Sequence, residues 1–251
     1  MLLKKILLNV IALILCAIMA SDAYSKDLKI VTAPWEGYTE KDGSGLYFEL
    51  FRKAMGVSKI DFVLMPWKRA QTQMEAKKFD VILGESTDIK YCSYPKWPID
   101  ADFFSIFSSI EKMPVWPDKS DLPRYRFLWV RGYNLSQLAS GLTAFQEIND
   151  VEEGMRMIAA GRADALIDYD ADLREKQIKL KLNPKMFHVA KTNLSGGLIY
   201  ACFAKQEGVH PDAKIFDAGM ENLYKTGELR KIFEKYKRIQ NFDKIVEKFG
   251  K

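Results

Sequence analysis

Strand-like and helical segments alternate regularly in the first part of this chain. The apolar runs KIVTA, KIDFVLM and FDVILG are typical of strands, and GLYFELFRKAM and WKRAQTQMEAKK lie between them. In the first of these two helical segments, Leu46, Leu50, Phe51 and Ala54 fall on one face. Three strands with a helix in each gap, within about 60 residues, predict a parallel sheet with right-handed crossovers.

A similar pattern returns after an irregular, proline-containing passage, Tyr91–Asp102. The runs FFSIFSSI, RYRFLWV, LTAFQEI, ADALID, MFHVA and GGLIYACFA are strand-like. Helices are predicted for NLSQLASG, with Asn134 as N-cap and Gln137 at N3, and for DVEEGMRMIAAG, capped by Asp150. A further helix is predicted for ADLREKQIKLKL, so the second unit repeats the plan of the first.

A helical tail, Pro211–Phe249, follows the two units and is broken at Thr226–Gly227. Two extended segments, Phe103–Phe107 and Ile199–Phe203, are predicted to cross between the units. Ligands of open α/β sheets bind beyond the carboxyl ends of the strands. The sequence therefore predicts two lobes with a cleft between them.

The N-terminus has the pattern of a secretory signal peptide. Two lysines precede the apolar run Ile6–Ala20, and Ala23 and Ser25 are spaced as in a cleavage site. The run is shorter than the roughly 20 residues that a bilayer-spanning helix needs. We therefore expect residues 1–25 to be removed on export; an uncleaved anchor helix and a lipid anchor on Cys16 are the alternatives.

Charge and composition do not indicate a nucleic-acid surface. Removing residues 1–25 takes two of the 38 basic residues and one of the 33 acidic ones, which leaves 36 against 32, or +4. The basic residues are scattered along helices that also carry acids, whereas nucleic-acid sites gather them into a patch. With 48% hydrophobic residues, the chain suits one large or two small globular domains.

Cysteine and histidine are scarce beyond the predicted signal peptide. Cys92 and Cys202 could form a disulfide in an oxidising compartment, or could be two small buried apolar residues. The histidines are His188 and His210, and neither a CxxC nor an HExxH motif occurs. We expect no metal site and no cofactor.

Four segments together resemble a known family. They are IVTAPWEGYTEKDGSGLYFELFRKA, MPWKRAQTQMEAKKFDVILGEST, VEEGMRMIAAGRADALIDYDAD and LYKTGELRKIFEKYK, in this order behind a signal peptide. The chain thereby resembles the periplasmic substrate-binding proteins of amino-acid ABC transporters, solute-binding protein family 3. The resemblance covers most of the mature chain.

The resemblance implies a type II periplasmic binding protein of α/β class. Each lobe would be a sheet flanked by helices, joined by two hinge crossings and closing on a small ligand. The first lobe would comprise residues 26–102 and 203–251, the second residues 103–202, and residues 1–25 the signal peptide. Such a protein acts as a periplasmic monomer that presents its ligand to a membrane permease or a sensor, and it is not an enzyme. The alternatives are an exported enzyme of this fold, such as a dehydratase, and an orphan sensory binding protein.

Two aromatic positions of the family have counterparts here. Trp35 and Tyr38, just past the first strand, would stack over the ligand or else plug the end of the sheet. Trp67 would face the opposite side of the ligand. Arg69, near the start of the same helix, could reach an anion or form an exposed salt bridge. Glu36 could hold a cationic group or remain a solvated loop acid.

The segment after the third predicted strand departs from the family. Glu85 lies in the stretch that supplies ligand contacts. Lys90 stands where amino-acid binders carry an arginine that grips the α-carboxylate with two parallel hydrogen bonds. Because lysine does not make that fork, an ordinary α-amino acid is in doubt as the ligand.

The second unit offers three further candidates. Arg131 and Tyr133, in VRGYNLSQ, could serve an anion or stack on a ring, or Tyr133 could simply pack beside Asn134. Asp168, at the end of ADALID, matches the family's acid for the ligand's ammonium, or it could cap the following helix. Asp170 and Asp172 are interpreted as solvated acids at a helix start. We expect the ligand to be small and polar, amino-acid-like or anionic.

Overall fold

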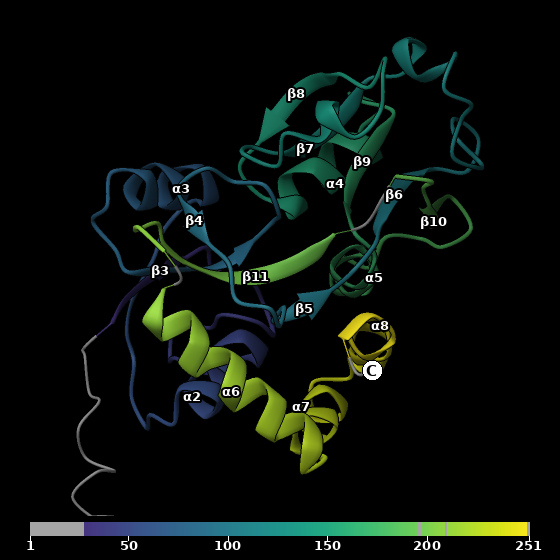
Figure 1. The fold of residues 1–251 in the computed structure, drawn as a ribbon. Helices are drawn as coiled ribbons and strands as arrows, with labels where there is room; N and C mark the ends of the chain where they lie inside the picture. Colours follow the sequence, from purple (N-terminus) through teal and green to yellow (C-terminus); the bar gives the residue numbers. More distant parts are fainter. Residues whose placement is uncertain (1–27, 195–196, 209, 250–251) are drawn as a thin grey trace, which may run out of the picture.

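The computed structural model describes residues 28–249 apart from 195, 196 and 209, so the predicted signal peptide lies outside the described residues. The chain builds two sheets, each flanked by helices (Figure 1). We call the half built on the six-stranded sheet the first lobe, and the half built on the five-stranded sheet the second lobe. The predicted two-lobed α/β architecture is confirmed.

The first lobe combines both ends of the described chain. Its strands are β1 (Lys29–Thr32), β2 (Asp61–Leu64), β3 (Val81–Glu85), β4 (Cys92–Ser93), β5 (Asp100–Ala101) and β11 (Leu198–Ala204). Its helices are α2 (Leu46–Met55), α3 (Trp67–Glu75), α6 (Pro211–Lys225), α7 (Glu228–Lys235) and α8 (Ile239–Phe249). The strand order is β2-β1-β3-β11-β4, with β5 also paired to β11. As predicted, β1 runs parallel to β2 and β3, whereas β11 runs antiparallel to β3.

Alternation along the strands divides the first lobe's core into two layers. Ile30 packs with α2, α6, α7 and α8 on one face of the sheet, and its neighbour Val31 packs with α3 on the other. This is the period-two pattern of a sheet covered on both sides. The predicted apolar face of α2 is buried, and α2 contacts α6 so closely that a Cβ at Gly219 would lie 1.9 Å from the carbonyl oxygen of Ala54.

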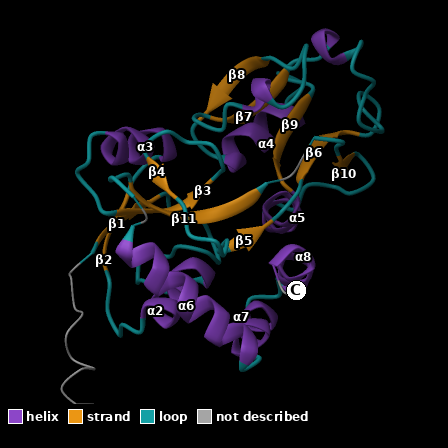
Figure 2. Ribbon diagram, in the orientation of Figure 1, coloured by secondary structure: helices purple, strands orange, loops and turns teal. Residues whose placement is uncertain are grey.

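The second lobe is built from the middle of the chain. Its strands are β6 (Phe104–Ser109), β7 (Phe127–Val130), β8 (Ala144–Ile148), β9 (Ala165–Tyr169) and β10 (Phe187–Lys191), and its main helices are α4 (Val151–Ala159) and α5 (Asp170–Lys179). They lie in the order β10-β6-β9-β7-β8 (Figure 2). β9 lies at the centre of this sheet, and α5 begins directly where β9 ends.

Of the two predicted N-cap residues in this lobe, both occupy the predicted position, but only Asp150 makes a side-chain capping bond. The Asp150 carboxylate accepts a 2.8 Å hydrogen bond from the backbone N–H of Glu153 at the start of α4. Asn134 makes no such cap: it precedes a short 3₁₀ helix, Leu135–Gln137, with φ +54° and no side-chain capping bond. Asparagine tolerates the left-handed region, so it supplies the turn here rather than the cap.

The crossings between the lobes lie beside the predicted segments rather than in them. β6 pairs along its length with β9 and β10, and β11 pairs with β3, so both predicted crossing segments belong to sheets. The chain changes sheet at Asp102–Phe103, and again between the end of β10 at Lys191 and the start of β11 at Leu198. The apolar runs that suggested extended crossings are strands of the two cores. The predicted domain boundaries stay a prediction.

A disulfide joins Cys92 in β4 to Cys202 in β11, which decides between the two alternatives left open by the sequence. Both cysteines are buried beside Val31 and Ile82 in the layer that α3 covers. The bridge fastens the short edge strand β4 to the sheet. Between residues 28 and 249, leaving aside the three undescribed positions, no helix is long and apolar enough to cross a membrane.

Candidate functional site

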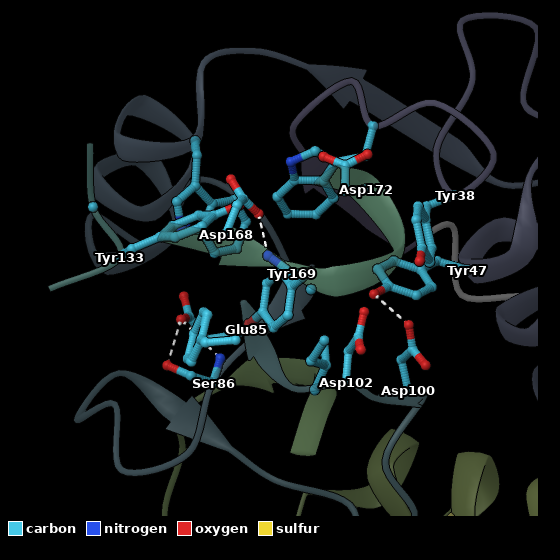
Figure 3. Close-up of a pocket in the computed structure, with 16 residues that line it drawn as sticks. Tyr38, Tyr47, Glu85, Ser86, Asp100, Asp102, Tyr133, Asp168, Tyr169 and Asp172 are labelled. Atoms are coloured by element: carbon cyan, nitrogen blue, oxygen red, sulfur yellow. Dashed lines mark hydrogen bonds between the residues drawn. The ribbon is translucent and has the colours of Figure 1, made fainter. Parts of the chain in front are cut away.

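A pocket lies between the two lobes, where several strands end (Figure 3). The first lobe contributes residues after β1, in α2 and α3, at the end of β3 and around the first crossing; the second contributes residues after β7, at the end of β9 and in the first turn of α5. About 70 Å³ is open to the centres of water molecules, which suits a small solute. The pocket is lined by Trp35, Tyr38, Tyr47, Trp67, Gly84, Glu85, Ser86, Asp100, Asp102, Phe104, Gly132, Tyr133, Asp168, Tyr169, Asp172 and Ile199.

Aromatic rings form much of the pocket wall. The ring centroids of Trp35 and Trp67 are 4.9 Å apart, so no ligand fits between them and the expectation that they face each other across the ligand is wrong. They form one wall instead, with Trp35 also against Tyr47 at 6.3 Å. Gly84 makes this packing possible, because a Cβ there would lie 2.4 Å from the Trp35 ring.

A second group of rings comes from β6, β9 and the loop after β7. Phe104 and Tyr169 stack with centroids 4.8 Å apart, and Tyr133 lies 6.0 Å from Tyr169. Tyr38 is buried below the first group, and its hydroxyl accepts a 2.8 Å hydrogen bond from Arg238 Nε. Ring faces attract cations and pack well on apolar chains.

Five carboxyl groups line the same pocket, and no lysine or arginine is among its described lining residues. The five acids are Glu85, Asp100, Asp102, Asp168 and Asp172. All five are buried, so each carries a desolvation penalty when it is ionised. The site is therefore strongly suited to positive charge.

Two of these acids have their oxygens occupied by protein donors. Glu85 accepts hydrogen bonds from the Tyr91 hydroxyl at 2.7 Å and the Ser86 backbone N–H at 3.0 Å. Asp100 accepts from the Tyr47 hydroxyl at 3.0 Å and the Asn241 side-chain amide at 2.9 Å. Burial nevertheless raises the pKa of both carboxyls. Glu85 and Asp100 are thus fixed in place by the first lobe.

Asp168 and Asp102 are only half satisfied. In each, Oδ1 accepts a 2.7 Å hydrogen bond from the backbone N–H of the next residue. In each, Oδ2 is buried and has no hydrogen-bond partner among the described residues. Burial raises the pKa of Asp168 well above its ordinary value, helped by the nearby Asp172, and raises that of Asp102 to about 7. These two oxygens are the acceptors that the protein leaves open.

The expectation that Asp170 and Asp172 are solvated is wrong. Asp172 is 9% exposed, lines the pocket and lies 4.0 Å from Lys176 Nζ, and burial raises the pKa of its carboxyl. Asp170 is equally buried and accepts from Ser105 Oγ at 2.8 Å. Because α5 begins at the end of the central strand β9, its first turn lies inside the protein.

The sequence-predicted site residues separate into two groups. Six of them meet in the pocket: Trp35, Tyr38, Trp67, Glu85, Tyr133 and Asp168. The basic candidates do not line it. Lys90 is exposed, whereas Arg69 and Arg131 line a separate surface groove, with Arg131 Nε 3.8 Å from Glu147. Glu36 is bonded to Lys179 at the rim.

Several lining residues were missed by sequence reasoning. Asp100 and Asp102 carried a usable signal, because two acids flank an alanine at the start of a predicted crossing between lobes. Tyr169 follows the predicted Asp168 directly. Tyr47 gave no signal, since it lies among core residues of α2 and looks like one of them. His188 and His210 lie outside the pocket lining; His188 bonds to Ser108 and the Met113 carbonyl.

Neither a family model nor a curated protein matches this chain. Several solved structures, however, are similar to it. The GluR0 ligand-binding core from Nostoc punctiforme, in complex with L-glutamate, aligns over 84% of this chain and 99% of its own with a TM-score of 0.68 at 14% identity. An ancestral arginine-binding protein bound to arginine aligns over 85% and 99%, with a TM-score of 0.69 at 16% identity. An amino-acid ABC transporter substrate-binding protein from Streptococcus pneumoniae, bound to L-arginine, aligns over 83% and 92%, with 0.65 at 16%.

These similarities confirm the two-lobed binding-protein fold that the sequence predicts. They cover nearly the whole length of the compared chains. All three compared proteins are binding proteins or ligand-binding cores. At such low identity they carry the fold to this chain and leave its ligand to be argued from the pocket.

Proposed function

We propose that this protein is an exported solute-binding protein that captures a small organic cation between its lobes and presents it to an ABC-type permease or a sensor protein. The single observation that carries the proposal is the charge of the pocket. Five buried carboxyl groups line it, without a lysine or arginine among the described lining residues. A positively charged solute would offset the desolvation of these acids.

The rings support the same ligand class. A cation over the face of Trp or Tyr gains roughly 0.5–2 kcal/mol, more when it is desolvated. Trp35, Trp67, Tyr133 and Tyr169 line the same pocket as the acids. An anionic solute would find no basic partner there, because Arg69, Lys90 and Arg131 lie outside the lining. We therefore propose a cationic solute in place of the amino-acid-like or anionic one expected from the sequence.

Binding would favour the closed arrangement of the lobes. Asp168 and Asp172 belong to the second lobe, whereas Glu85 and Asp100 belong to the first. A solute that touches both groups stabilises the closed state by the energy of its second set of contacts. A permease or sensor can then recognise the closed form.

A panel of solute classes tests this function. Refolded, ligand-stripped protein is heated with organic cations, zwitterionic amino acids and organic anions in turn. Saturation at about 100 times the dissociation constant stabilises the folded state by about 2.7 kcal/mol, so a true ligand raises the melting temperature. We expect stabilisation by cations and its loss in Asp168→Ala. Stabilisation by anions alone would contradict the proposal.

The membrane partner and the alternatives of a same-fold enzyme or an orphan sensory protein need a separate experiment. Tagged protein is used to capture partners from detergent-solubilised membranes, with and without the cation found in the panel. Capture of permease subunits that depends on the cation supports a transport role, and capture of a receptor supports a sensor. Mass spectrometry of the incubated solute tests the enzyme, because a changed mass would show a reaction.

A further inference from the structure

The pocket offers two separate carboxylate oxygens that could each accept a hydrogen bond from a cation. A site for a single ammonium group would need only one. Asp168 Oδ2 and Asp102 Oδ2 are both buried, both line the pocket and both lack a hydrogen-bond partner within the described chain. In each case the next residue's backbone N–H holds Oδ1, which leaves Oδ2 as the free atom. A buried acceptor without a partner costs about 1–3 kcal/mol, and more when it is charged.

From this pair, and resting on the proposed function, we propose that the solute is a dication with two separate cationic nitrogens, one bound at Asp168 and the other at Asp102. Asp168 is the penultimate residue of β9 in the second lobe, whereas Asp102 lies in the crossing that leads out of the first. A single ammonium bound at one of them would leave the other oxygen buried and unpaired. A dication satisfies both and bridges the second lobe to the crossing.

The other acids do not compete for this role. Glu85 and Asp100 are already held by protein hydrogen bonds, and neither carboxylate oxygen of Asp172 is both fully buried and without a partner. No three-residue group of His, Cys, Asp and Glu suited to a metal occurs within the described residues, which favours an organic dication over a metal ion.

Lys244 does not fill the site at Asp102. Its Nζ lies 3.8 Å from Asp102 Oδ1, the oxygen that already accepts the backbone bond, and 3.8 Å from the centre of the Phe103 ring. Lys244 therefore lowers the cost of ionising Asp102 without occupying Oδ2. Because Asp102 already has a nearby lysine and Asp168 has no such ion pair, we expect a solute with a single positive charge to bind at Asp168.

The space between the two acids suits an apolar spacer. Figure 3 places Tyr169 between Asp168 on one side and Asp100 and Asp102 on the other. The Tyr169 ring stacks on Phe104, and both line the pocket. Methylene groups pack well on such faces, while a carboxylate at the centre of the solute would meet no lysine or arginine among the described lining residues.

Matched amines test the inference on the wild-type protein by calorimetric titration. The α,ω-diamines of three, four and five carbons are compared with the monoamines of the same length. We expect the best diamine to bind at least about tenfold more tightly than its monoamine, the effect of one charge-assisted hydrogen bond. A monoamine or a quaternary ammonium that binds as tightly as every diamine would overturn the inference and leave the proposed function intact.

Two substitutions then locate the second nitrogen. In Asp102→Asn, the ratio of diamine to monoamine affinity should fall to near one, because the second site has lost its charge. Asp61→Asn is the matched control, since Asp61 is an exposed acid of β2 outside the pocket lining, and the ratio should stay as in the wild type. An unchanged ratio in Asp102→Asn would overturn the assignment to Asp102. Failure of every amine, mono or di, would overturn the proposed function itself.

Discussion

The carboxylate of Glu36, in the loop after β1, accepts a 2.8 Å hydrogen bond from Lys179 Nζ at the end of α5. This contact joins the first lobe to the second at the rim of the pocket. A second contact, Arg238 Nη2 to Glu175 at 2.8 Å, ties the same helix to the tail of the first lobe. Lys176 Nζ also lies 3.6 Å from Glu36 Oε2, so three ion pairs join α5 to the first lobe while Asp172, in its first turn, lines the pocket.

We predict that Glu36→Gln weakens binding of the ligand by about two- to fivefold, because exposed ion pairs contribute about 0.2–1 kcal/mol and this one joins the two lobes. The loss should shrink at high salt. Titration calorimetry measures it. Glu221→Gln is the control, since the Glu221–Lys225 pair, at 2.6 Å, lies within α6. Equal losses in both variants would show that closure does not involve Glu36.

We predict that affinity for the four-carbon diamine rises with pH between about 5 and 8. Burial raises the pKa of Asp102 to about 7, helped by the repulsion of Asp100 and Asp170 and opposed by the attraction of Lys244. Below that pKa the empty carboxyl holds a proton, which the cation must displace, while the amines stay charged.

The slope should approach tenfold per pH unit for each proton displaced. Titrations in two buffers of different ionisation enthalpy count the released protons, and Asp102→Asn should release about one fewer. Affinity that is flat over this pH range would contradict the prediction.

We predict that reduction of the Cys92–Cys202 disulfide lowers the free energy of unfolding by about 3–5 kcal/mol, since the bridge closes a long loop between residues 110 apart. Denaturant titration with and without reductant measures the change. The Cys92→Ala, Cys202→Ala double variant should be equally destabilised and insensitive to reductant. If the reduced wild-type protein keeps its full free energy of unfolding, the disulfide does not stabilise the fold.

We predict that Gly84→Ala weakens ligand binding between about twofold and thirtyfold, the range of one cation–π contact. Its Cβ would displace the Trp35 ring, and its backbone has φ +101°. Gly161→Ala separates the backbone strain from the displacement of the ring, because Gly161 has φ +67° and a Cβ there would meet nothing within 4 Å. The control should lose stability but keep affinity, as measured by denaturation and calorimetry. Equal affinity for the ligand in both variants would show that Trp35 does not contribute to binding.

The order of strands and helices was predictable because it depends on local periodicity. The face of α2, the cap at Asp150 and the break at Gly227 are all readable from spacing and residue type. The crossings were misplaced, because a short strand-like run looks the same in the sequence whether it pairs in a sheet or spans two lobes. Pairing partners far apart in sequence decide that question.

The site was predictable where a residue lies close to the end of a strand, as Trp35 and Asp168 do. It was not predictable at Asp172, because the burial of a helix's first turn depends on what covers it. Lys90 was expected in the pocket but does not line it. The reason is related: a matching position in the sequence does not fix the direction in which an exposed loop runs. The negative charge of the pocket could not be predicted from the sequence, because its acids come from both lobes and meet only in the folded chain.

One titration tests the central claim most directly: stripped wild-type protein against the four-carbon α,ω-diamine and against the four-carbon dicarboxylate. The two solutes match in length and differ in the sign of their charge. The acid-lined pocket predicts one-to-one binding of the diamine and no measurable binding of the dicarboxylate. Binding of the dicarboxylate as tightly as the diamine, or more tightly, would contradict a site built for cations.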